Sequence, residues 1–102
     1  MIIYHITTAA AWRQSLVAGY YEAPSLITEG FIHCSTESQV SGVLERYFSG
    51  KTKLLKLVID TERLSSPLKF ELAPSVNEEF PHIYGRLNHD AVVAVVPIAE
   101  NR

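Results

Sequence analysis

The sequence predicts one α+β domain over residues 1–102, with two principal helices and several short strands. Its length of 102 residues is that of a single ordinary domain. A composition of 47% hydrophobic, 10% aromatic and 20% charged residues is typical of a chain that buries a core. Two segments have the apolar spacing of helices, and the runs around them have the alternating or continuous apolar character of strands.

The first third of the chain is predicted as strand, helix and strand. Residues 2–7 alternate with β-branched side chains, as strands do. Residues 9–17 are rich in helix formers and stop at Gly19, a usual residue after a helix C-terminus. Pro24 lies in the connection that follows, because proline disfavours helical angles at the residue before it. Residues 30–35 are predicted to form the next strand.

The second helix has the clearest signal in the chain. Thr36 and Gln39 form a candidate capping box, in which each side chain satisfies a backbone donor that the helix leaves free. An apolar stripe follows at helical spacing, and it consists of Val40, Val43, Leu44, Tyr47 and Phe48. Gly50 ends the segment, so we expect this helix to pack one face on a sheet.

The C-terminal half is predicted to hold three strands. Residues 53–60 are apolar on both faces, which indicates a central strand covered on two sides. Residues 68–72 alternate after a break at Pro67. A turn at residues 88–90 then leads to the last strand, at residues 91–98.

Charge and cysteine content exclude several classes of protein. Nine Lys and Arg against eleven Asp and Glu give a net charge of −2, which supplies no field for a phosphate polymer or an anionic membrane. The single cysteine, Cys34, excludes an internal disulfide and a multi-thiolate zinc site. Residues 1–5 do not open a signal peptide, and the apolar runs are far shorter than the roughly 20 residues of a membrane span. We therefore expect a cytoplasmic protein that binds neither membranes nor bulk nucleic acid. The sequence does not specify its oligomeric state.

Two histidines lie at the ends of predicted strands in the same pattern, His5-Ile6-Thr7 and His33-Cys34-Ser35. Strand alternation places each imidazole and its hydroxyl on one side, and Cys34 on the other, where a core thiol is expected rather than a nucleophile. Such pairs suit a phosphate or a ribose diol, and an imidazole titrates in the range that proton transfer at pH 7 requires. The alternative is that each histidine is a half-buried structural residue with a satisfied ring.

A third cluster lies in residues 80–86, where His82, Tyr84 and Arg86 surround Gly85. We predict a loop here, the type of segment that often carries functional groups on a rigid scaffold. The alternative is a surface loop with an aromatic anchor in the core.

Glu71 is the one carboxylate in a predicted strand with apolar neighbours on both sides, so it is either paired or functional. The pair Glu78-Glu79 is predicted as a solvated loop, and His89 as solvent-exposed. A metal site from the histidines lacks tight spacing, so none is predicted. The candidate catalytic residues are His33, His5, His82 and Glu71, and the candidate ligand-binding residues are Thr7, Ser35, Thr36, Tyr84 and Arg86.

At these residues the sequence resembles a bacterial family, the domain of unknown function 952 family. The segments that carry the resemblance are Tyr4-His5-Ile6, Trp12, Tyr21 to Leu26, Glu29 to Thr36, and Phe80 to Gly85. They extend over nearly the whole chain, and the Gly-Phe-Ile-His-x-Ser-Thr stretch is specific.

The resemblance implies a compact relative of the ADP-ribosyltransferase fold, whose split or strongly curved, mainly antiparallel sheet holds NAD in a cleft. His5 matches the first-strand histidine of that fold, and residues 30–36 match its second-strand element. Glu71 is a counterpart by residue type of the late-strand glutamate, which steadies positive charge on the ribose as nicotinamide leaves. The implied function is an ADP-ribosyltransferase-like enzyme with a strand-end pocket for NAD or another nucleotide-like ligand.

Two alternatives remain open. The first is a catalytically silent module that binds a nucleotide or another small phosphate-bearing ligand in the same pocket. The second is a hydrolase similar to two-histidine phosphoesterases, in which His5 and His33 would act as acid and base on a cyclic phosphate.

Overall fold

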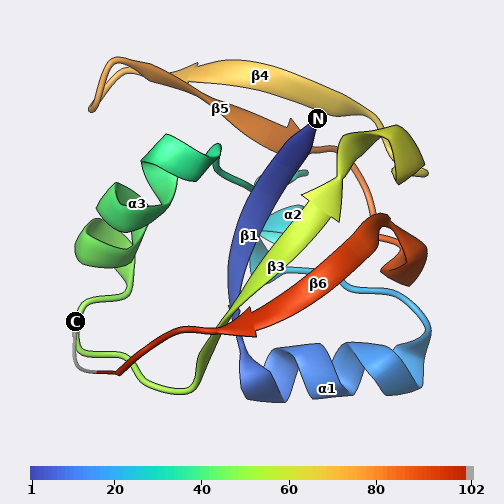
Figure 1. Cartoon of the computed structure of the whole chain (residues 1–102). Coiled ribbons are helices and arrows are strands. Elements are labelled where there is room, and N and C mark those ends of the chain that lie inside the picture. Colours follow the sequence, from blue (N-terminus) through green and yellow to red (C-terminus); the bar gives the residue numbers. More distant parts are fainter. Residues whose placement is uncertain (101–102) are drawn as a thin grey trace.

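The computed structural model describes residues 1–100 and contains two three-stranded antiparallel sheets (Figure 1). The first sheet has the order β1-β3-β6, with β1 at Ile2–Thr8, β3 at Leu54–Asp60 and β6 at Val92–Pro97. The second has the order β2-β5-β4, with β2 at Ile32–His33, β5 at Glu78–Ile83 and β4 at Leu68–Ala73. The α-helices are α1 (Ala9–Ala18), α2 (Pro24–Thr28) and α3 (Val40–Tyr47), and the 3₁₀ turns are η1 (Glu37–Gln39), η2 (Thr61–Arg63) and η3 (His89–Ala91). The predicted α+β class with antiparallel strands is confirmed.

The first sheet has the central strand that the sequence predicts. β3 pairs with β1 in an unbroken register from Ile2 opposite Asp60 to Thr8 opposite Leu54. On its other side β3 pairs with β6, with a register shift between Val58 and Ile59. β3 is therefore central by its pairing, and all of its residues are buried or half-buried.

The second sheet corrects a prediction, because β5 occupies most of the segment expected to be a loop. Glu78 and Glu79 begin this strand rather than a solvated loop, and it continues to Ile83 at the centre of its sheet. Pro81 hides the strand in the sequence, since proline is rare in central strands. The Pro81 carbonyl accepts from the Cys34 amide at 3.0 Å, so the backbone of Pro81 faces the β2 side of the sheet. β2 ends at His33, so the N–H that proline lacks is not needed for pairing there.

One pair of backbone hydrogen bonds connects β1 of the first sheet to the segment after β2. The Tyr4 amide donates to the Ser35 carbonyl at 2.8 Å, and the Ser35 amide donates to the Tyr4 carbonyl at 2.7 Å. β2 itself is shorter than the predicted strand at residues 30–35. This bridge places the ends of the two histidine-bearing segments side by side.

The helices start and stop largely where the sequence indicates. The Thr8 hydroxyl caps α1 by accepting from the Ala11 amide at 3.1 Å, and Gly19 ends it with a φ of +92°. The predicted capping box of Thr36 and Gln39 is present, although a 3₁₀ turn precedes α3. Pro24 begins α2 instead of lying in an irregular connection, because proline at a first helical position has a suitable φ and no amide to leave unpaired.

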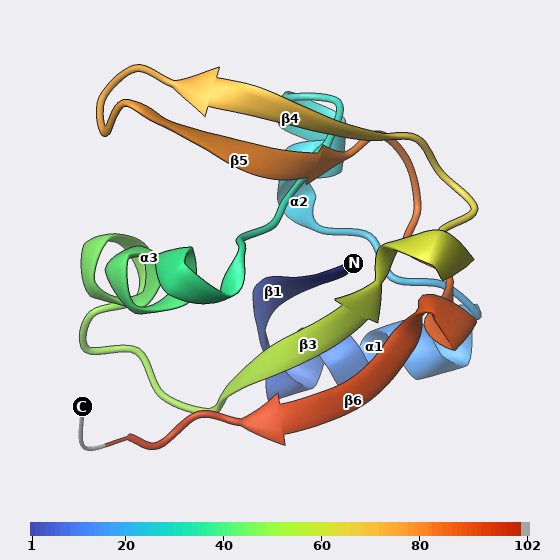
Figure 2. The same cartoon turned by 45° about the horizontal axis from the view of Figure 1, so that its top comes forward.

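Both sheets contribute to one apolar core. Its fully buried members are Ile3, Ile32, Leu57, Ile59, Ile83, Leu87 and Ala91. Cys34 belongs to this core, as expected. Figures 1 and 2 show α1 against the first sheet, and α3 at one side of the molecule between that sheet and the β4–β5 hairpin. Within residues 1–100 no helix is long and apolar enough to span a bilayer.

His89 differs from its prediction as a solvent-exposed residue. It is half-buried, its Nε2 lies 3.1 Å from the Ser15 hydroxyl, and its ring meets the Trp12 ring edge-on at 5.2 Å. A neighbouring aspartate suggested solvation, but the sequence does not reveal that α1 packs beside η3. His89 is thus a structural residue away from the cavity described next.

Candidate functional site

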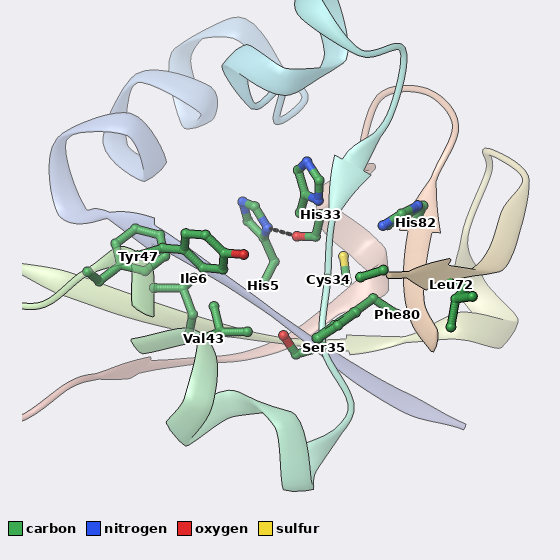
Figure 3. A pocket seen from close by; sticks show the side chains of 12 residues that line it. His5, Ile6, His33, Cys34, Ser35, Val43, Tyr47, Leu72, Phe80 and His82 are labelled. Atoms are coloured by element: carbon green, nitrogen blue, oxygen red, sulfur yellow. Dashed lines mark hydrogen bonds between the residues drawn. The ribbon is translucent and has the colours of Figure 1, made fainter. Parts of the chain in front are cut away.

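A cavity of about 430 Å³ lies between the two sheets and α3 (Figure 3). Its polar residues are His5, His33, Ser35 and His82. Its apolar wall comes mainly from α3, β4 and β5 and consists of Val43, Tyr47, Phe48, Leu72, Ala73 and Phe80, with Ile6 and Cys34 completing the lining. The volume is within the range of about 300–1,000 Å³ that is typical of small-molecule sites.

Three strands bring the polar residues together. His5 comes from β1, His33 from β2 and His82 from β5. His33 and His82 are direct cross-strand partners, so their side chains share one face of the second sheet. The Tyr4–Ser35 bridge brings His5 to the same place. Strand pairing, rather than closeness in sequence, therefore builds this end of the cavity.

His5 is held by hydrogen bonds at both ring nitrogens. Its Nδ1 lies 2.5 Å from the His33 carbonyl oxygen, and its Nε2 lies 2.8 Å from the Tyr21 hydroxyl. Burial lowers the pKa of His5 to about 4, so the ring is neutral at pH 7. A carbonyl oxygen only accepts, which places the proton of the neutral ring on Nδ1 and leaves Nε2 unprotonated beside the Tyr21 hydroxyl. His5 is therefore occupied internally although it lines the cavity.

Thr7 shares the face of His5, as strand alternation predicts. Its hydroxyl lies 2.8 Å from the hydroxyl of Tyr21, which thereby bridges both members of the first motif. Burial also raises the pKa of the Tyr21 phenol. Thr7 does not line the cavity, and its connection to the lining runs through Tyr21 to His5.

His82 is held by a carboxylate and an aromatic ring. Its Nδ1 lies 2.7 Å from the Glu71 carboxylate, and the Phe31 ring stacks on the imidazole with centroids 4.0 Å apart. Glu71 also accepts from the Tyr84 hydroxyl at 2.5 Å. The Tyr84 hydrogen bond, followed by the one from His82, lowers the pKa of Glu71, while the same contact raises the pKa of Tyr84. Glu71 is thus a paired carboxylate that lies outside the cavity lining and reaches it through His82.

His33 has its own carboxylate. Its Nε2 lies 2.9 Å from Glu29, and about half of its side chain is exposed to solvent. The His33 and His82 rings are nearly perpendicular, with centroids 5.2 Å apart. Phe31 meets His33 edge-on at 4.9 Å and so contacts both imidazoles. The two histidines form a pair in which each ring is oriented by a separate glutamate.

Four of the five predicted ligand-binding residues lie outside the cavity lining, and Thr7 is one of them. Thr36 is used in the capping box before α3. Arg86 pairs with Glu22 at 3.2 Å and lies over the Tyr20 ring at 3.8 Å. Tyr84 also lies outside the lining, although it reaches the site through Glu71.

Several site residues carry no clear signal in the sequence. Phe31 is two positions before His33, a spacing that places two strand residues on one face and is detectable in principle. Glu29, Tyr21 and the apolar wall from α3 depend on tertiary packing. Cys34 lines the cavity with its thiol buried, and that burial raises its pKa.

The charges at the cavity limit its chemistry. None of the lining side chains, all within residues 1–100, is Lys or Arg. No group of three or more His, Cys, Asp or Glu side chains in the described part of the chain is arranged to hold a metal ion. The lining offers imidazoles, the Ser35 hydroxyl, the Tyr47 phenol and the buried Cys34 thiol, while the carboxylates of Glu29 and Glu71 act through His33 and His82.

Comparison with known families now places the chain. The family described as "Protein of unknown function (DUF952)" matches residues 6–95. The chain belongs to this family. The DUF952 match includes every residue that lines the cavity except His5.

Solved structures of one relative have the same fold. The crystal structure of protein CC0527 from Caulobacter crescentus is 29% identical, with a TM-score of 0.85 over 94% of this chain and 84% of that one. A double mutant of CC0527 gives the same TM-score at 28% identity and the same coverage. Its solution NMR structure gives a TM-score of 0.81 at 28% identity, over 95% of this chain and 84% of that one. A comparison with curated proteins found no match.

Proposed function

We propose that this protein binds a small nucleotide-like ligand in the cavity, with NAD as the first ligand to test, in the manner of an ADP-ribosyltransferase-like cleft. The observation that supports this most is the convergence on one cavity of His5, His33 and His82 from three strands, with Ser35 just after β2. Sites of this kind combine an apolar wall with a few placed polar groups.

The lining suggests how such a ligand would lie. The wall that includes Tyr47 and Phe80 suits a planar aromatic ring, such as a purine or the nicotinamide ring. The imidazoles of His33 and His82 suit the ribose that follows this ring. No Lys or Arg within residues 1–100 lines the cavity, so the phosphates of the ligand would remain outside it.

Glu71 supports an ADP-ribosyltransferase-like activity. Hydrogen bonds from Tyr84 and His82 keep its pKa low, so the carboxylate is ionised at pH 7. A fixed negative charge next to the ribose would stabilise the positive charge that develops as nicotinamide departs. In this proposal His5 holds the strand ends in place, because both of its ring nitrogens are already bonded.

The proposal is tested by adding NAD, ADP-ribose or AMP to the purified chain and measuring its melting temperature and the release of free nicotinamide. We expect NAD to raise the melting temperature and Glu71→Gln to reduce nicotinamide release without preventing binding. His89→Gln is the matched control, since His89 lies away from the cavity. A rise in melting temperature without nicotinamide release would favour the silent binding module. No rise with any nucleotide would overturn the proposal.

A further inference from the structure

Two imidazoles, those of His33 and His82, lie side by side in the cavity lining, whereas cleavage of NAD does not require both a general acid and a general base. We propose that His33 and His82 act as general base and general acid in the hydrolysis of a nucleoside cyclic phosphodiester. The inference rests on the proposed nucleotide-like ligand, but not on NAD. It also replaces the pair predicted from the sequence, His5 and His33, because His5 has no free ring nitrogen.

Each of the two neighbouring imidazoles has one ring nitrogen that its glutamate leaves free. The carboxylate of Glu29 occupies Nε2 of His33, and that of Glu71 occupies Nδ1 of His82. The other ring nitrogens, Nδ1 of His33 and Nε2 of His82, have no hydrogen-bond partner within residues 1–100. With ring centroids 5.2 Å apart and both rings lining the cavity, the two imidazoles are close enough to contact the same small group.

The chemistry explains why two imidazoles are needed. A cationic nicotinamide ring leaves ribose as a neutral molecule, so that reaction has no use for a general acid. Hydrolysis of a phosphodiester instead needs one proton taken from water and one given to the departing ribose oxygen. Two imidazoles, each oriented by its own carboxylate, match that requirement.

The charge of the site favours a diester over more highly charged phosphates. One protonated imidazole supplies a single positive charge, and the described cavity lining contains no Lys or Arg to add to it. A cyclic phosphodiester carries one negative charge, whereas a phosphomonoester carries about 1.5 to 2 at pH 7. The substrate class is therefore a cyclic phosphodiester whose base enters the apolar part of the cavity.

The surroundings of the two rings distinguish their roles. The His33 side chain is 53% exposed and can reach a water molecule, whereas that of His82 is 11% exposed. The Glu71 carboxylate accepts a hydrogen bond from Nδ1 of His82, which leaves Nε2 of this less exposed ring for the departing ribose oxygen. We therefore assign the base to His33 and the acid to His82, with Phe31 positioning both rings by stacking and edge contact.

In the reaction, Nδ1 of His33 takes a proton from water as the water oxygen forms a bond to phosphorus. The bond from phosphorus to one ribose oxygen breaks, and its electron pair goes to that oxygen, which takes the proton from Nε2 of His82. The product is a nucleoside monophosphate with one free ribose hydroxyl. His33 is left protonated and His82 neutral, and exchange of one proton with solvent restores the starting state.

The test uses the full chain with 2′,3′-cyclic AMP, following formation of the adenosine monophosphate by chromatography. We expect turnover that falls at least about 100-fold in both His33→Gln and His82→Gln. Glu71→Gln should lower kcat with little change in KM, because Glu71 acts through His82. His89→Gln should keep the wild-type rate, and melting temperatures check that each variant is folded.

The outcomes separate this inference from the proposed binding function. If 2′,3′-cyclic AMP raises the melting temperature but is not hydrolysed, the acid–base pair is overturned and the proposed ligand class stands. If hydrolysis persists in His33→Gln or His82→Gln, the assignment of that residue is wrong and the inference fails. If no nucleotide, cyclic or NAD, raises the melting temperature and none is turned over, both proposals fail together.

Discussion

The imidazole Nδ1 of His5 lies 2.5 Å from the backbone oxygen of His33, so the first histidine of the doubled motif holds the chain that carries the second. The two residues looked equivalent in the sequence because both precede a hydroxyl residue by two positions. In the structure they differ in burial and in free ring nitrogens. His5 is buried and bonded at both nitrogens, and His33 is half exposed.

The buried state of His5 predicts a pH-dependent stability. Its pKa is lowered from 6.5 to about 4, so the unfolded chain binds a proton over this range while the folded chain does not. The contribution of neutral His5 to the free energy of unfolding is fully present above pH 6.5. It is lost as the pH falls toward 4, by up to roughly 3 kcal/mol. Urea unfolding of wild type and His5→Gln at pH 7.5, 5.5 and 4.5 measures it. Equal pH slopes in the two proteins would contradict this account.

Removal of the Tyr21 hydroxyl is expected to lower the free energy of unfolding while the aromatic ring stays in place. Tyr21→Phe removes the partner of both His5 and Thr7, and an unsatisfied buried polar group costs about 1–3 kcal/mol. The free energy of unfolding from urea titration should fall by that amount. Tyr20→Phe is the matched control, because it retains the ring that contacts Arg86. A similar loss in both variants would show that the bridge contributes nothing specific.

The burial of Cys34 predicts slow thiol chemistry in the folded protein. Burial raises the thiol pKa, and only 3% of the residue is exposed, so little thiolate is available to reagents. Labelling with a thiol-reactive disulfide should be slow in buffer and fast in urea. Rapid labelling of the native protein would mean that the cavity opens to solvent more readily than its lining indicates.

Gly85 predicts a local clash that other glycines with positive φ do not share. Its φ is +152°, and an added Cβ would lie 2.5 Å from the Ser66 hydroxyl oxygen. Gly50 has a φ of +78° with nothing within 4 Å of such a Cβ. Gly85→Ala should therefore destabilise more than Gly50→Ala, which carries only backbone strain of about 1–3 kcal/mol. Thermal unfolding of the two variants compares them, and Ser66→Gly should recover part of the Gly85→Ala loss.

Local patterns predicted those parts of the fold that depend on neighbours in sequence. The capping box of Thr36 and Gln39 and the central strand at residues 53–60 are of this kind. β5 was missed because Pro81 and two adjacent glutamates disguise a central strand. What makes Pro81 acceptable is the end of β2, a relationship that only the folded sheet contains.

In the candidate site, too, local sequence identified individual residues, whereas strand pairing determines their contacts. The sequence singled out His33 and His82, and the β2–β5 register brings them together. The contact of Glu71 with His82 depends on the β4–β5 register, and that of Glu29 with His33 depends on the turn before β2, neither of which a residue pattern specifies. Arg86 was chosen for its charge alone, and it bonds to Glu22 instead of lining the cavity.

The bridge between Tyr4 and Ser35 has a consequence for how the cavity can be monitored. Its two amides belong to segments of different sheets, and the residues next to them, His5 and His33, line the cavity. Amide hydrogen exchange at Tyr4 and Ser35 therefore reports separation of the sheets at the site itself. A ligand that contacts both sheets would slow exchange at these two amides together, which provides a residue-specific signal of occupancy in solution.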